Sequence, residues 1–152
     1  MTPGTDLNKL AYCGLYCGAC PMYLATAAGT LEAMAGRGLA ADHLRCLGCR
    51  SETVSVSCQN CAVKTCASGQ GLVSCADCAE FPCRVLRSFD RDGAHQHQGV
   101  VNALQECRAV GPEEWLRTHA ARHTCAGCGR KLSFLDQSCP ACGRGWLSEV
   151  FD

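Results

Sequence analysis

The sequence predicts a small, metal-stabilised α+β protein, with irregular cysteine-rich knuckles, a few helices and a C-terminal zinc ribbon built on a β-hairpin. Three observations predict this fold. Sixteen of the 152 residues are cysteines, and most come in Cys-x-x-Cys pairs. Leu, Val and Phe make up less than a fifth of the chain, too little for an ordinary core. Two thiolates separated by two residues fit two corners of a tetrahedron around one metal ion, so metal bonds are expected to replace the missing core.

The spacing of the cysteines divides the chain into three parts. Residues 1–90 are expected to form a cysteine-rich metal-binding domain. Residues 91–123 are expected to form a helical segment that packs on this domain, and residues 124–152 to form the zinc ribbon. Six Cys-x-x-Cys pairs are enough for two to three zinc ions. The pairs are Cys17/Cys20, Cys46/Cys49, Cys58/Cys61, Cys75/Cys78, Cys125/Cys128 and Cys139/Cys142.

Within the first part, a helix is expected over residues 21–36. Pro21 suits a first helical position, apolar residues recur at helical spacing, and Gly36 or Gly38 can end the helix. Further along, the pattern Cys-x2-Cys-x4-Cys occurs twice, seventeen residues apart, starting at Cys58 and at Cys75. This weak repeat predicts two similar knuckle-and-turn units.

Residues 84–123 are expected to be helical. An apolar stripe that includes Cys107 predicts a helix ending at Gly111, and Cys107 is expected to be a buried free thiol. Pro112, followed by two acidic residues, predicts the start of a second helix. In that helix Trp115 is expected to pack against the cysteine-rich part. The nearby His119 and His123 are expected to be exposed helix residues rather than ligands.

The C-terminal part carries the strongest metal signal. Ten residues separate its two pairs, and a glycine directly after each second cysteine lets the backbone turn. The intervening arm is expected to be a short hairpin. Four thiolates would close a structural zinc site and leave no position for an activated water molecule. The expected ligands are Cys125, Cys128, Cys139 and Cys142.

The charge pattern argues against nucleic-acid binding. The chain has 14 basic and 14 acidic residues, and the balance also holds within each of its three parts. There is no apolar run of membrane-spanning length and no secretory signal pattern, so a cytoplasmic protein without a membrane segment is expected. Cys-x-x-Cys pairs also suit one metal better than mutual disulfides.

Three alternatives concern the first cysteines, which have the spacing Cys13-x3-Cys17-x2-Cys20. Radical S-adenosylmethionine enzymes hold an iron–sulfur cluster with this spacing, but the chain is too short for their large barrel. A plain iron–sulfur cluster, with Cys66 or Cys83 as the fourth ligand, remains open. A dithiol redox site at Cys17 and Cys20 lacks the expected βαβ context.

The run AYCGLYCGACPMYLA, the later CLGC, and the run CQNCAVKTCASGQGLVSCADCAEFPC resemble a family of cysteine-rich prokaryotic proteins, domain of unknown function 3795. The resemblance implies zinc binding and no established activity. It also extends a ligand role to the whole first set of cysteines, without fixing which of them share a metal. This set is Cys13, Cys17, Cys20, Cys46, Cys49, Cys58, Cys61, Cys66, Cys75, Cys78 and Cys83.

These observations predict a zinc-binding, non-catalytic protein that acts as a binding or adaptor module for a protein partner. The sequence contains no nucleophile–base pair, paired carboxylates or phosphate-binding glycine loop, so no enzyme is expected. The alternative is an iron–sulfur protein that transfers electrons or senses redox state through its N-terminal cysteines.

Overall fold

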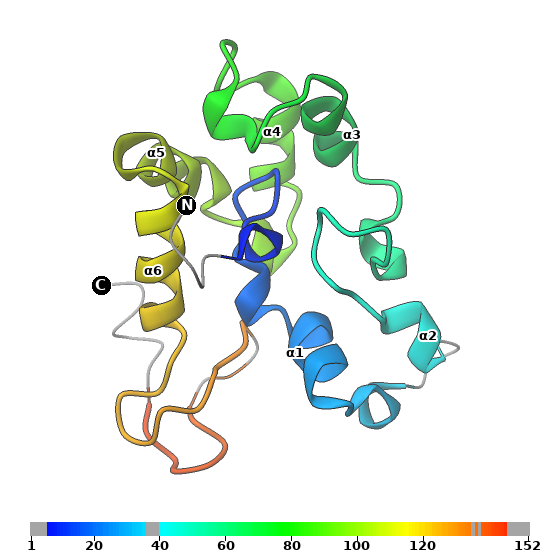
Figure 1. Cartoon of the computed structure of the whole chain (residues 1–152), viewed down its shortest axis with the longest axis vertical. Helices are drawn as coiled ribbons and strands as arrows, with labels where there is room; N and C mark the ends of the chain where they lie inside the picture. The colour runs from blue at the N-terminus through cyan, green and yellow to red at the C-terminus, as the bar shows by residue number, and fades with distance from the viewer. Residues whose placement is uncertain (1–5, 36–39, 135, 137, 146–152) are drawn as a thin grey trace.

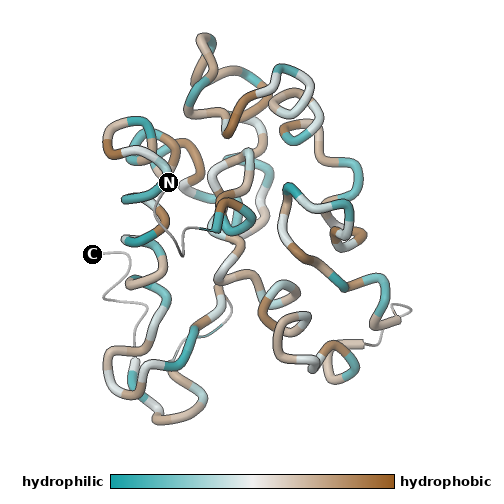
Figure 2. The backbone as a smooth tube through the Cα atoms, viewed as in Figure 1, coloured by the Kyte–Doolittle hydropathy of each residue, from teal (hydrophilic) through white to brown (hydrophobic). Residues whose placement is uncertain are grey.

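The computed structural model describes residues 6–35, 40–134, 136 and 138–145. Short helices joined by turns form nearly all of its regular structure, and the β structure of these ranges is limited to three isolated antiparallel bridges. The fold is therefore mainly helical, with less strand than an α+β mixture has. Figure 2 shows that short hydrophobic stretches alternate with hydrophilic ones along the chain. Each helix in the described ranges is too short or too polar to span a bilayer.

The first half of the chain carries short helices, several of a single turn. In Figure 1, α1, α2 and α3 follow one another along one side of the molecule, from blue to green. The elements are η1 (Leu7–Lys9), η2 (Cys17–Ala19), α1 (Pro21–Ala28), η3 (Leu31–Met34), α2 (Ala41–Leu44), η4 (Val56–Cys58), α3 (Ala62–Gly69) and η5 (Cys75–Asp77).

Helix α1 starts at Pro21 as predicted but ends well before residue 36. Gly29 takes a left-handed conformation with φ of 72°, and its amide closes the last turn on the carbonyls of Ala25 and Thr26. The chain then continues into η3, so the predicted long helix is two short ones. Gly36 and Gly38 lie outside the described residues.

The second half contains α4 (Arg84–Asp90), η6 (His95–His97), α5 (Val100–Val110) and α6 (Pro112–Arg122). Gly111, with φ of 88°, separates α5 from α6, and Pro112 occupies the first turn of α6. Both helices therefore form where the sequence predicts them. The predicted repeat is less regular, because Cys66 lies within α3 whereas Cys83 precedes α4.

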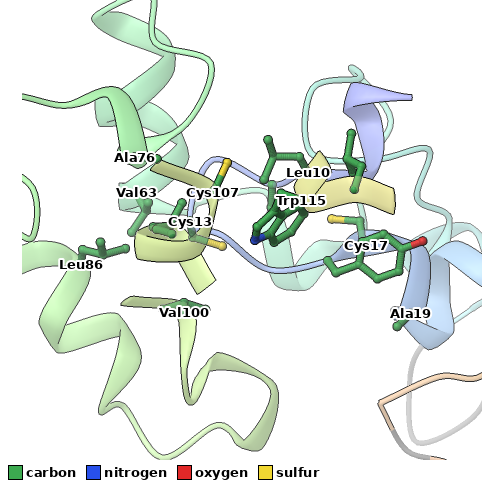
Figure 3. Close-up of a cluster of buried hydrophobic side chains, with 14 residues drawn as sticks. Leu10, Cys13, Cys17, Ala19, Val63, Ala76, Leu86, Val100, Cys107 and Trp115 are labelled. Carbon is green, nitrogen blue, oxygen red and sulfur yellow. The ribbon is translucent and has the colours of Figure 1, made fainter. Parts of the chain in front are cut away.

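The main core lies between the loop of residues 13–20 (the first cysteine loop) and the packed pair α5–α6. Trp115 is 1% exposed, and its indole Nε1 donates a hydrogen bond to the carbonyl of Ala103 at 2.8 Å. Figure 3 shows Cys13, Cys17 and Cys107 among the apolar side chains of this core. Cys107 is buried and free, as predicted. Thiols thus occupy positions that aliphatic residues fill in most proteins.

Gly14 is the glycine whose replacement should harm this core most. It has φ of +92°, and a Cβ placed there would lie 2.5 Å from Leu104 Cγ and 3.0 Å from the carbonyl oxygen of Val100. Gly14→Ala should lower the free energy of unfolding by on the order of 3 kcal/mol, through backbone strain and overpacking together. Urea denaturation followed by circular dichroism measures this loss.

Gly29→Ala is the matched control. Gly29 also has positive φ, but an added Cβ would meet nothing within 4 Å. Its substitution should cost only the strain, about 1–2 kcal/mol. Equal losses for the two variants would mean that the contact with Leu104 relaxes freely.

Candidate metal centre

The C-terminal segment contains two knuckles of the same local structure. In the first, the amide of Cys125 donates to the carbonyl of Arg130, and the amide of Gly129 donates back to the carbonyl of Cys125, both at 2.8 Å. In the second knuckle, Cys139 and Gly143 form the equivalent bonds at the same 2.8 Å, with Arg144 as the acceptor for Cys139. Gly129 and Gly143 have φ of 80° and 81°. The repeated geometry explains why glycine follows each second cysteine.

The two knuckles bring four thiols together. All four sulfur atoms lie within 4.8 Å of one another. The sulfurs of Cys125 and Cys142 are 3.5 Å apart, as are those of Cys128 and Cys139. Metal–sulfur bonds of about 2.3 Å place tetrahedral thiolates about 3.8 Å apart, close to the observed spacing. Cys125, Cys128, Cys139 and Cys142 could therefore hold a metal ion.

Backbone amides prepare two of these thiols for metal binding. The amides of Cys128 and Gly127 donate to the Cys125 sulfur and lower the pKa of that thiol. The amides of Cys142 and Ala141 act in the same way on Cys139 and lower its pKa to about 6. Because only the thiolate binds metal, these donors favour the ligand form of Cys125 and Cys139 near neutral pH. The pKa values of the other two thiols, Cys128 and Cys142, are raised, because hydrogen bonds with neighbouring thiols outweigh the opposing backbone amides of Arg130 and Arg144.

The described residues of the ribbon contain no β-hairpin. Each knuckle closes through one antiparallel bridge, Thr124–Lys131 in the first and Ser138–Gly145 in the second. The arm between them turns instead of extending, because the Asp136 carboxylate accepts from the amide of Ser133 at 2.9 Å. Leu135, Gln137 and residues 146–152, which the sequence also assigns to the ribbon, lie outside the described residues.

The ribbon arm contacts the first cysteine loop. The amide of Phe134 donates to the carbonyl of Ala19 at 2.9 Å, and the amide of Leu132 donates to the carbonyl of His123 at 2.8 Å. Phe134 also packs against the main core. In Figure 1 the orange segment runs from the end of α6 toward the start of α1.

The eleven N-terminal cysteines are arranged more loosely. Cys13, Cys17 and Cys46 are buried and Cys66 is exposed. The rest are partly buried, namely Cys20, Cys49, Cys58, Cys61, Cys75, Cys78 and Cys83. No disulfide links any of the sixteen cysteines, all of which the structure describes. Among the described residues, no second group of three ligand atoms is as compact as the ribbon thiols.

The expectation that His119 and His123 are exposed is wrong. Both rings pack beside Tyr16, with ring centroids 5.8 Å and 5.3 Å from its own, and His119 also lies 4.0 Å from Trp115. Burial, together with Arg122 and His123, lowers the pKa of His119 to about 3, so its ring is neutral at neutral pH. His119 and His123 follow Trp115 by four and eight residues, a spacing that places all three on one face of a helix. This spacing could have indicated that the two histidines share the buried face of Trp115.

Comparison with known proteins bears on the N-terminal part. A family model described as a protein of unknown function, DUF3795, matches residues 9–88, just over half of the chain. The chain belongs to this family. The DUF3795 region includes all eleven N-terminal cysteines, and the segment with the four C-terminal cysteines follows it. No curated protein and no solved structure matches the chain.

Proposed function

We propose that this DUF3795 protein is a zinc-binding, non-catalytic adaptor whose ribbon holds one zinc ion. The observation that most supports this proposal is the set of four preformed thiols at tetrahedral spacing. Four thiolates suit zinc, and they would occupy every coordination position. Such a site organises a surface and leaves no place for a reactive water molecule. The ribbon's contact with the first cysteine loop joins this surface to the family domain.

Removal of one ribbon ligand tests the zinc site. The six Cys-x-x-Cys pairs predict two to three zinc ions per chain, and Cys139→Ser should hold one fewer than the wild type. The rest of the chain should keep its other ions, because well-separated sites behave additively. Elemental analysis and native mass spectrometry of the full chain measure the difference. Cys107→Ala, which removes a buried thiol outside every pair, is the control and should keep the wild-type content.

Two results would contradict this assignment. An unchanged zinc content in Cys139→Ser would show that the ribbon holds no zinc. Loss of two ions at once would mean that ribbon thiols complete an N-terminal site. In that case the whole chain would behave as one metal-folded unit.

A surface lined by arginines supports the proposal that the partner binds through an acidic segment. Arg84 and Arg87 of α4 and Arg91, which directly follows that helix, line an open depression of about 690 Å³ together with Pro82 and Ser88. In the described part of the chain, no carboxylate lies within ion-pair distance of these three guanidinium groups. Guanidinium groups bind carboxylates in a bidentate manner, so an acidic peptide segment fits this face.

Binding of a fluorescent glutamate-rich peptide tests this surface. The wild-type chain should bind the peptide saturably at low salt, and Arg84→Glu/Arg91→Glu should weaken binding at least tenfold, because both changes reverse the charge of the face. Arg117→Glu is the control, since Arg117 already pairs with Glu113 and Glu114 on α6. Fluorescence anisotropy gives the affinity. Tighter binding of single-stranded RNA than of the peptide would assign the face to nucleic acid instead.

A further inference from the structure

Two contacts in the metal centre pair each exposed thiol with a buried one. Cys128 and Cys142 are exposed, whereas Cys125 and Cys139 are buried. The sulfur of Cys128 lies 3.5 Å from that of Cys139, and the sulfur of Cys142 lies 3.5 Å from that of Cys125. Each contact therefore joins a sulfur on an exposed residue to a protected sulfur on the opposite knuckle.

Both sulfur–sulfur distances are shorter than metal binding requires. A tetrahedral site with metal–sulfur bonds of about 2.3 Å keeps every pair of sulfurs about 3.8 Å apart. A disulfide bond is about 2.05 Å long, so each of the two pairs would have to close by only about 1.5 Å. A Cβ on Gly127 would lie 3.3 Å from the Cys142 sulfur and 3.7 Å from the Cys125 sulfur. The missing side chain of Gly127 therefore leaves room for this approach between the knuckles.

The two pairs are nested along the chain. The outer pair, Cys125 and Cys142, encloses the inner pair, Cys128 and Cys139. The inner pair in turn encloses the arm with Phe134, whose amide hydrogen-bonds the first cysteine loop. Disulfides in this order would join the two knuckles in the arrangement in which they already lie. The arm would then keep both of its ends together without a metal ion.

We propose that the four ribbon thiols form a peroxide-reactive site, in which two disulfides between the knuckles replace the metal ion. This inference goes beyond the adaptor function and rests on the proposed zinc site only for its starting state. In that state all four sulfurs are thiolates, because a cysteine binds metal in this form. Their reactivity then follows exposure, so Cys128 and Cys142 react with peroxide first, and Cys139 and Cys125 form the disulfides with them.

Hydrogen peroxide is the oxidant, and each disulfide consumes one molecule of it. The exposed thiolate attacks a peroxide oxygen, so that a sulfur–oxygen bond forms, the oxygen–oxygen bond breaks and hydroxide leaves. The buried thiolate then attacks the sulfenic acid, so that the sulfur–sulfur bond forms, the sulfur–oxygen bond breaks and a second hydroxide leaves. Two electrons pass from the thiolate pair to the peroxide, and two protons from the solvent convert the hydroxides to water. Two molecules of a low-molecular-weight thiol reverse each disulfide by exchange and become a disulfide themselves.

Tryptic mapping of the full chain tests the pairing, because trypsin cleaves after Arg130 and Lys131, between the two knuckles. The zinc-loaded protein is treated with a few equivalents of hydrogen peroxide, free thiols are alkylated, and the unreduced digest is analysed by mass spectrometry. The peptides of residues 123–130 and 132–144 should appear as one cross-linked species, and one zinc ion should be released. Disulfides within each Cys-x-x-Cys pair would instead leave these two peptides unlinked.

Single substitutions identify which sulfurs join. Cys142→Ser keeps the inner pair, so the alkyl group should be found on Cys125. Cys139→Ser keeps the outer pair, so the alkyl group should be found on Cys128. In the wild type, dimedone, which traps sulfenic acids, should label the two exposed thiols about tenfold more than the two buried ones. Cys66→Ser, which removes an exposed thiol outside the ribbon, is the control and should give the wild-type cross-link.

Three outcomes would overturn the proposal. They are unlinked knuckle peptides in the wild type, an alkyl group on the other cysteine of the first knuckle in either variant, and dimedone mainly on the buried thiols. Failure of the zinc assignment is a separate result. If Cys139→Ser keeps the wild-type zinc content, the ribbon holds no zinc, but the cross-linked peptides should still form from the free thiols of the wild type. If Cys139→Ser loses one zinc ion while the wild-type peptides stay unlinked, only the peroxide-reactive site is wrong.

Discussion

Complete removal of metal by a strong chelator should unfold the protein. Aliphatic residues are scarce, and the main core includes the thiols of Cys13, Cys17 and Cys107. Each structural zinc ion contributes on the order of 10 kcal/mol to folding. This contribution is as large as the net free energy of unfolding of a typical small domain. The helical circular-dichroism signal should be largely lost, and tryptophan fluorescence should shift to longer wavelength as Trp115 becomes exposed.

Re-addition of zinc is the control for this experiment. Stoichiometric Zn²⁺ under reducing conditions should restore the helical signal, which separates metal loss from irreversible oxidation of the thiols. If circular dichroism stays unchanged after metal removal has been verified, the helices of residues 84–123 carry the fold alone.

Trp115→Ala should be the most damaging single substitution in the apolar core. Trp115 is 1% exposed, packs edge-on against Tyr16 at 6.1 Å between ring centroids, and lies on α6 facing α5. Truncation of a buried aromatic residue to alanine typically costs about 3–5 kcal/mol. Urea denaturation should show this loss, or the variant should fail to fold when metal is limiting.

Two further variants make the result interpretable. Trp115→Phe keeps most of the volume but loses the hydrogen bond to the Ala103 carbonyl, so it should cost about 1–2 kcal/mol. Leu47→Ala, at a side chain that is 50% exposed, should change stability by less than about 0.5 kcal/mol. Equal effects of Trp115→Ala and Leu47→Ala would contradict the assigned core.

Local signals in the sequence predicted the helix boundaries well where a glycine ends one helix and a proline starts the next. Gly111 and Pro112 define the junction of α5 and α6, and both act through the backbone alone. The same reasoning failed at Gly29, because a glycine inside an apolar pattern is compatible both with a helix end and with a continuous helix. Its left-handed conformation depends on how η3 packs against α1.

The candidate metal site was predictable from spacing for the ribbon but not for the family domain. The two ribbon pairs meet because each knuckle is a local structure that needs no distant contact. Which cysteines of the family domain come together depends instead on long-range packing, such as the hydrogen bond from the amide of Cys46 to Thr26 Oγ1.

The hydrogen bond between Phe134 and Ala19 has a consequence for the order of events during synthesis. Ala19 lies between Cys17 and Cys20, and its carbonyl accepts a bond from a residue more than a hundred positions later in the chain. A nascent chain must therefore expose residue 134 before this loop gains its final support. Until then the loop between Cys17 and Cys20 lacks this hydrogen bond, so one of the earliest segments to be translated is among the last to become fully ordered.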